Sequence, residues 1–334
     1  MKIALITPAG ARSRSGNRHT AMRWAEMLRS LGHKVRVSVS WDGRPADLMI
    51  ALHARRSHES IAQFRERFPA SRLVVVLTGT DLYRDIRSDS DARASLVLAD
   101  RLVVLQDMGK LELPARFRRK ARVIYQSAQV HASPEPPSRR FRVAVIGHLR
   151  EEKDPFRAAL ALAHLRDLPE LQIVQLGAAL SPEMARAARR LERADPRYRW
   201  LGNLPHWQAM RWLSRSHALV VSSRMEGGAN VICEAAAAGV PVIASRVSGN
   251  IGMLGRSYPG TYRLADERAL ARQMRRAARD SAYYSRLKRL TAARRPLFRP
   301  AAESEGLRRL VAEFAPRPQS SRSRISRTGA KLRR

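Results

Sequence analysis

Residues 218–244 carry the sequence ALVVSSRMEGGANVICEAAAAGVPVIA. The apolar run Ala218–Ser222 is followed by a polar loop, an alanine-rich segment of helical length, and a second apolar run, Val240–Ala244. Gly239 and Pro241 form a stop signal for the helix between the runs. Strand, loop, helix and strand in this order predict a βαβ unit and therefore a parallel sheet.

The same alternation extends over the chain. Helix-period apolar residues from Met22 to Leu31 stop at Gly32, a second helix starts near Pro155, and Ser181-Pro182 starts a helix that runs to about Ala194. A final helix is expected at about Ala301 to Phe314. Further apolar runs predict strands at Lys2–Thr7, Val35–Val39, Asp47–Leu52, Leu73–Leu77, Leu102–Leu105, Val123–Tyr125, Val143–Ile146 and Leu171–Leu176.

The pattern restarts after a linker at His131–Arg140, which is rich in proline and serine. With 334 residues, the chain is long enough for two domains. We therefore expect an α/β fold with two facing Rossmann-like domains, at 1–135 and 141–290, and an interdomain cleft. Loops at the carboxyl ends of both sheets would line that cleft, where ligands of such sheets bind.

Composition excludes several classes of protein. Hydrophobic residues make up 44% of the chain, enough for real cores, and the single cysteine, Cys233, excludes a disulfide scaffold. No apolar run approaches the length that spans a bilayer, and Met1–Gly10 is too short for a signal peptide. A cytoplasmic protein is expected.

The net charge of +34 suggests a nucleic-acid partner at first. However, only seven of the 63 basic residues are lysine, a bias that GC-rich codons produce without functional demand. Aromatic residues amount to 6% and form no stripe suited to stacking on bases. The acid-free segment Arg317–Arg334 is expected to be a basic disordered tail.

The loop after Val221 carries the pattern with most chemistry. Gly227 and Gly228 allow backbone N–H groups to approach a ligand, and the N-terminus of the following helix favours phosphate. Glu226 and Glu234 can accept hydrogen bonds from sugar and ribose hydroxyl groups. This combination indicates a nucleotide-sugar site. The alternative is that both glutamates are solvated and the glycines form only a turn.

This segment resembles the E-x7-E signature of family-4 glycosyltransferases with the GT-B fold. The resemblance implies that Glu226 binds the donor sugar and Glu234 the nucleotide ribose. Gly147–Lys153 resembles the family's diphosphate-binding G-R-L-x-x-x-K segment, with His148 in place of the arginine and Arg150 as a candidate substitute. The expected donor-binding residues are His148, Arg150, Lys153, Glu226, Gly227, Gly228, Ala229, Asn230, Val231 and Glu234.

Several blocks are similar to one subgroup, the SenB-type selenosugar synthases of selenoneine biosynthesis. They are Ser15–Arg18, Leu52–Ser57, Thr78–Asp85, Gly147–Arg150 and Ser223–Asn230. The resemblance covers the chain to about residue 315 and implies sugar transfer from UDP-GlcNAc or UDP-glucose to selenophosphate, forming a carbon–selenium bond. It also implies that 1–135 is the acceptor domain, that 141–290 is the nucleotide-sugar domain, and that a helix at 296–315 crosses back to the first.

Loops of the N-terminal half are rich in groups that bind anions, which suits a small charged acceptor. Arg18, Arg55 and Arg56 supply charge, although any one of them is as readily a solvated arginine. A structural role is an equal alternative for His53, and Asp81 can bind a hydroxyl group or cap its loop. The expected acceptor-binding residues are Gly16, Asn17, Arg18, His53, Arg55, Thr78, Gly79, Thr80 and Asp81.

Lys153, Glu226 and His53 are the expected catalytic residues. Asp89-Ser90-Asp91 matches the D-x-D of metal-dependent glycosyltransferases, but its position before a helix favours capping. We therefore expect no metal and no cofactor, with the leaving UDP neutralised by Lys153, Arg150 and the amides of Gly228–Val231. Cys233 is expected to be a small buried apolar residue.

Two other functions stay open at this point. A family-4 glycosyltransferase with an envelope lipid or glycan acceptor would use the arginine-rich surface to approach anionic membranes. A basic nucleic-acid-binding protein would show affinity that falls steeply with salt.

Overall fold

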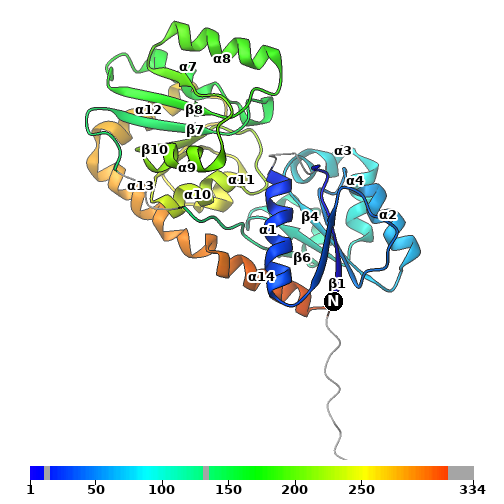
Figure 1. Cartoon of the computed structure of the whole chain (residues 1–334). Coiled ribbons are helices and arrows are strands. Elements are labelled where there is room, and N and C mark those ends of the chain that lie inside the picture. Colours follow the sequence, from blue (N-terminus) through cyan, green and yellow to red (C-terminus); the bar gives the residue numbers. More distant parts are fainter. Residues whose placement is uncertain (11–15, 131–134, 315–334) are drawn as a thin grey trace, which may run out of the picture.

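The computed structural model describes residues 1–10, 16–130 and 135–314. Two six-stranded parallel sheets, each flanked by helices, face one another (Figure 1). Their strand orders are β2-β1-β3-β4-β5-β6 and β12-β11-β10-β7-β8-β9. This is the α/β architecture that the alternating pattern predicted. The expected tail at 317–334 and part of the linker lie outside the described residues.

The first sheet belongs to the N-terminal half, residues 1–130. Its strands are β1 (Lys2–Ile6), β2 (Lys34–Ser38), β3 (Leu48–Leu52), β4 (Arg72–Leu77), β5 (Arg101–Val104) and β6 (Ala121–Val123). Its helices are α1 (Gly16–Ser30), α2 (His58–Arg67), the π-helix η1 (Asp81–Asp85), α3 (Ile86–Ser88), α4 (Ser90–Leu98), α5 (Gly109–Glu112) and α6 (Ala115–Arg118).

The second sheet belongs to the C-terminal half, residues 135–298. Its strands are β7 (Phe141–Ile146), β8 (Leu171–Leu176), β9 (Tyr198–Trp200), β10 (Ala218–Val221), β11 (Val242–Ser245) and β12 (Thr261–Tyr262). Its α-helices are α7 (Arg157–Ala161), α8 (Pro182–Ala194), α9 (His206–Ser214), α10 (Asn230–Ala238), α11 (Ser248–Leu254), α12 (Glu267–Arg279) and α13 (Ser281–Ala293). Short 3-10 turns are η2 (Glu151–Lys153), η3 (Leu162–His164) and η4 (Arg295–Phe298), and α14 (Pro300–Ala312) ends the described chain.

Local signals in the sequence set several element ends. Ser181 Oγ accepts a hydrogen bond from the Met184 backbone N–H and caps α8. Gly239 adopts a left-handed conformation and ends α10. The strands β9 and β12, of three and two residues, were missed because so short a segment carries no alternation. Strand β6 begins and ends two residues earlier than expected, at Ala121 and Val123.

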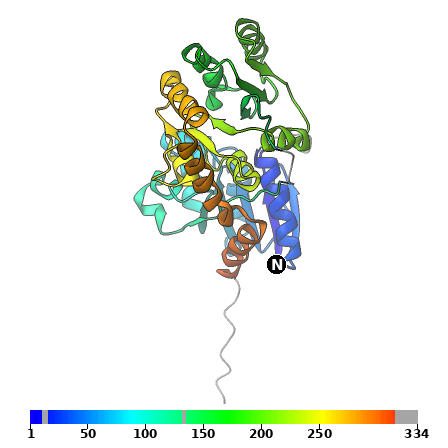
Figure 2. The ribbon, with the colours of Figure 1, turned by 90° about the vertical axis from the view of Figure 1, so that its left-hand side faces the viewer.

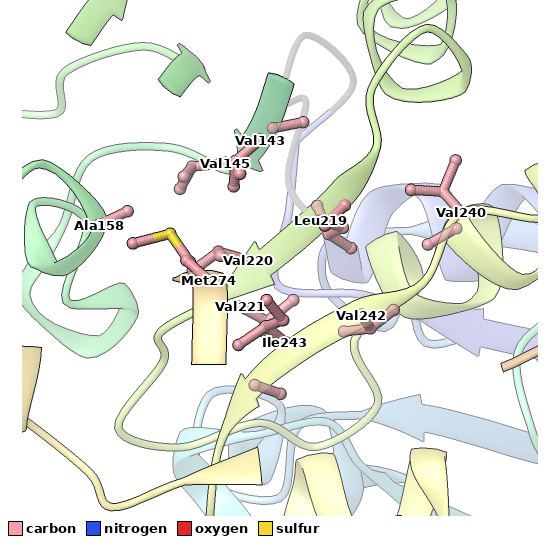
Figure 3. Close-up of a cluster of buried hydrophobic side chains, with 14 of the residues drawn as sticks. Val143, Val145, Ala158, Leu219, Val220, Val221, Val240, Val242, Ile243 and Met274 are labelled. Carbon is pink, nitrogen blue, oxygen red and sulfur yellow. The ribbon is translucent and has the colours of Figure 1, made fainter. Parts of the chain in front are cut away.

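Each sheet is buried between apolar layers. In the C-terminal half, valine, leucine and isoleucine side chains of β7, β10 and β11 pack with Ala158 and Met274 from the covering helices (Figure 3). In the N-terminal half, one face packs against α2 and α4, and the other against α1 and α14. Among the described residues, no helix is long and apolar enough to cross a membrane.

Helix α14 joins the end of the chain to the N-terminal half. The helices α13 and α14 run from the second sheet down to α1 (Figures 1 and 2). Glu303 of α14 is fully buried and accepts hydrogen bonds from Arg23 Nε at 2.8 Å, Trp24 Nε1 at 2.6 Å and the Ser127 backbone N–H at 2.8 Å. A buried carboxylate is tolerated because it is paired and hydrogen-bonded, so this contact fixes α14 on α1.

Candidate active site

A cleft of about 1290 Å³ lies between the two halves. Loops after β1, β3 and β4 line one side, and loops after β7, β8 and β10 line the other. The carboxyl ends of both sheets therefore meet at the cleft, as the fold predicts. From the expected site, the lining includes Gly16, Asn17, His53, Thr78, Gly79, Thr80, His148, Arg150, Lys153, Glu226, Gly228, Ala229, Asn230, Val231 and Glu234.

Glu226 and Lys153 form an ion pair at the floor of the C-terminal face. Lys153 Nζ lies 2.5 Å from Glu226 Oε1, and Ser223 Oγ donates to the same oxygen at 2.6 Å. The side chain of Ser222, directly after β10, donates to the carbonyl groups of Lys153 and Asp154 and so holds η2 in place. Two segments that are far apart in the sequence thus bring a cation and a carboxylate together.

Glu234 has a partner that the sequence did not indicate. His206, the first residue of α9, places Nε2 2.9 Å from Glu234 Oε1. This hydrogen bond raises the pKa of His206 above its usual value, although burial acts in the opposite direction. No motif in the sequence pointed to His206, because only the packing of α9 on α10 brings it to the cleft.

Gly227 and Gly228 lie against the N-terminal half, a contact that the sequence did not predict. A Cβ atom at Gly227 would overlap the backbone of Thr78, and one at Gly228 would overlap Leu105, both in the N-terminal half. Gly227 does not line the cleft. The prediction that it opens the loop to a ligand is therefore corrected: its missing side chain lets the two halves approach.

Asp81 lies in a different position from the one predicted. Its side chain is fully buried and accepts hydrogen bonds from the backbone N–H groups of Ala54 at 3.0 Å, Thr78 at 3.0 Å and Gly79 at 2.8 Å. It therefore shapes the loop after β4 and is not exposed to the cleft. Asp81 thus caps its loop, which was the alternative role, and the prediction that it binds the acceptor is corrected.

His53 lines the cleft, but both of its ring nitrogens have partners inside the protein. Nδ1 accepts from the Arg56 backbone N–H at 3.3 Å, and Nε2 lies 3.0 Å from Thr80 Oγ1. The neutral ring therefore carries its proton on Nε2 and donates it to Thr80, which leaves the Thr80 hydroxyl group free to donate into the cleft. Asp85 Oδ2 is 4.0 Å from Nε2. The backbone of His53 is left-handed, which is uncommon for a residue with a side chain.

The arginines of the N-terminal face divide into two groups. Arg55 forms an ion pair with Asp89 at 2.9 Å and does not line the cleft, so the prediction that it binds the acceptor is corrected. Arg18 does not line the cleft either. Arg56 lines the cleft. Asp89 Oδ1 accepts from the Ala92 backbone N–H at 2.8 Å. This bond confirms the predicted helix cap.

Two further observations concern metals and the cysteine. Within 1–10, 16–130 and 135–314, no three His, Cys, Asp or Glu side chains lie close enough together to hold a metal ion. Cys233 is fully buried in the core, and burial raises the pKa of its thiol well above the usual value. The prediction that it is a buried apolar residue is confirmed.

The family model of glycosyl transferases group 1 matches residues 126–294, half of the chain. The chain therefore belongs to the group 1 glycosyl transferases and is a glycosyltransferase. The matched region contains Lys153, Glu226 and Glu234. No curated protein matches the sequence.

Solved structures show the same fold. HepE of Anabaena, in complex with UDP-glucose, has a TM-score of 0.74 at 15% identity, with 94% of this chain and 100% of that one covered. The sucrose-phosphate synthase of Thermosynechococcus elongatus gives 0.74 at 18% identity, with 94% and 99% covered. A glycosyltransferase of Rickettsia africae gives 0.70 at 13% identity, with 94% and 97% covered. The protein thus has the GT-B fold.

Proposed function

We propose that this glycosyltransferase moves a sugar from UDP-GlcNAc or UDP-glucose to selenophosphate, as a selenosugar synthase of selenoneine biosynthesis. The observation that carries the proposal is the chemistry of the two cleft faces. The C-terminal face has a lysine and an arginine beside three glutamates, and the N-terminal face has small hydrogen-bond donors, two arginines and one glutamate. The first set suits a nucleotide sugar, and the second suits a small anion.

The donor half of the proposal rests on residues of the C-terminal face. Lys153 and Arg150 line the cleft, and in this proposal they bind the diphosphate together with backbone N–H groups at the N-terminus of α10. Glu226 and Glu234 line the cleft, and in this proposal they accept hydrogen bonds from the sugar and the ribose. The complex of HepE with UDP-glucose supports the choice of a UDP-sugar for a protein of the same fold.

In the proposed reaction, the selenium of selenophosphate attacks the anomeric carbon of the donor sugar. The carbon–selenium bond forms as the bond between that carbon and the diphosphate oxygen breaks, and UDP leaves with the electron pair. Lys153, Arg150 and the amides of Gly228–Val231 stabilise the developing negative charge. Selenophosphate is already anionic and polarizable, so the attack needs little help from a general base.

The acceptor half of the proposal rests on the N-terminal face. Asn17, Arg56 and Thr80 line it, and among the described residues no Phe, Tyr or Trp side chain lines the cleft. A lipid acceptor would favour exposed apolar and aromatic groups at this place. We propose accordingly that residues 1–135 bind the acceptor, that residues 141–290 bind the nucleotide sugar, and that the helix within 296–315 ties the two together.

The test is a product assay with the full chain. Purified protein is incubated with UDP-GlcNAc or UDP-glucose and selenophosphate, and the products are analysed by mass spectrometry. A sugar that contains selenium, formed together with UDP, is expected. Turnover on lipid or glycan acceptors without a selenium product would contradict the selenophosphate assignment and favour the second candidate acceptor class.

A further inference from the structure

His206 and Glu234 form a polar pair inside the cleft. His206 is the first residue of α9 and Glu234 lies in α10, and the two side chains meet at 2.9 Å. Both residues line the cleft. The Glu234 side chain is 15% exposed, and that of His206 is 61% exposed. The histidine is therefore accessible to a ligand, while the carboxylate is held beneath it.

The opposite half contributes a second histidine. His19 of α1 faces His206 with 6.3 Å between the ring centroids. Arg23 of α1 also lines the cleft, and the charged groups that act on this pair of rings are Glu234 and Arg23. The bond to Glu234 raises the pKa of His206, whereas burial and then His206 itself lower the pKa of His19. His206 is thus the more readily protonated of the two rings.

We propose that His206 is a positioning residue of the donor site, which orients the Glu234 carboxylate toward the ribose hydroxyl groups and offsets its charge beside the diphosphate. This inference rests on the proposed function, because it takes a UDP-sugar as the donor. Oε1 of Glu234 is bound by His206, so Oε2 is the atom that accepts a ribose hydroxyl group.

The physical reason is electrostatic. A diphosphate is an anion, and an unpaired carboxylate near it would lower the affinity of the site for the donor. Protonated His206 forms a neutral pair with Glu234, so the site keeps a hydrogen-bond acceptor for the ribose without a net negative charge. Deprotonation of His206 removes that compensation. Donor affinity should then fall as the pH rises through the raised pKa of His206.

A comparison of UDP with 2′-deoxy-UDP distinguishes recognition of the ribose hydroxyl group from the rest of nucleotide binding. UDP and 2′-deoxy-UDP are titrated calorimetrically into the full chain and into its His206→Ala and His206→Gln variants. His206→Ala should weaken UDP binding about tenfold and reduce the preference for UDP over 2′-deoxy-UDP. His206→Gln keeps a donor for Glu234 without the charge, and it should retain more of that preference. His164→Gln, a histidine of η3 outside the cleft lining, is the matched control.

The pH series distinguishes a positioning role from a merely structural one. The ratio of the UDP dissociation constants of His206→Gln and the unchanged chain cancels the titration of UDP itself. This ratio should be largest at about pH 6 and approach one by about pH 9. A ratio that does not change with pH, together with an unaltered ribose preference in His206→Ala, would overturn the inference. UDP binding by the unchanged chain would in that case still uphold the donor assignment. Absence of UDP binding by the unchanged chain would overturn both.

Discussion

The two halves of the cleft each place a buried carboxylate shortly after a central strand, and its hydrogen-bond partners differ between the halves. Asp81, after β4, is bound by three backbone N–H groups. Glu226, after β10, is bound by the side chains of Lys153 and Ser223. Backbone partners are fixed by the fold, whereas side-chain partners can rearrange around a ligand. A carboxylate after a strand therefore shapes the backbone in one half and is available for chemistry in the other.

The largest effect is expected from removing the cation of the Glu226 pair. Lys153→Ala should lower kcat/KM about 100-fold or more, because the leaving diphosphate would lose the ammonium group that we propose stabilises its charge. Because buried Glu226 keeps Ser223 but loses its cation, the unfolding temperature should also fall, so kcat/KM is measured well below it. Lys288→Ala, an exposed lysine of α13, is the control. Near-normal kcat/KM in Lys153→Ala would remove Lys153 from the mechanism.

A substitution at Asp81 should affect the stability of the fold and not the chemistry of the site. Asp81→Asn replaces a charged acceptor of three N–H groups with an amide, and should lower the free energy of unfolding by about 2 kcal/mol. Denaturant unfolding measures this change, with the exposed Asp91→Asn as control. If Asp81→Asn kept full stability and lost activity, Asp81 would belong to the chemistry of the site and the comparison would fail.

The contact between the halves gives a smaller, separate test. Gly227→Ala places a methyl group against the Thr78 backbone. The halves must then move apart, at a cost of about 1–3 kcal/mol, so both the unfolding free energy and kcat/KM should fall. A Cβ atom at Gly10 meets nothing within 4 Å, so Gly10→Ala should leave the unfolding free energy unchanged. Equal stability of the two variants would show that the close approach does not matter.

The sequence predicted the residues of the C-terminal face of the cleft better than those of the N-terminal face. Lys153, Glu226 and Glu234 belong to local motifs whose strand–loop–helix context fixes where they lie. Arg55 and Arg56 are neighbours in one loop, and only tertiary contacts, the pair with Asp89 among them, decide which faces the cleft. His206 could not be found at all, because its role depends on α9 packing against α10. The sheets followed from apolar runs, apart from the shortest strands.

The smallest effect is expected from removing metal ions. Excess EDTA should leave turnover unchanged, because Asp89 is engaged as a helix cap and in a pair with Arg55. Initial rates of UDP release with and without EDTA measure this. Complete loss of activity, restored by Mn²⁺, would return Asp89 and Asp91 to the mechanism.

In the proposed reaction, the C-terminal face binds the UDP-sugar and the N-terminal face binds the anionic acceptor. Two cleft arginines, Arg56 and Arg150, test it as a matched pair. Rates of UDP release at varied donor and selenophosphate concentrations give both KM values for each alanine variant. Arg56→Ala should raise the KM for selenophosphate about tenfold and leave the donor KM unchanged, and Arg150→Ala should do the reverse. If both variants raised the same KM, the assignment of the two faces would be contradicted.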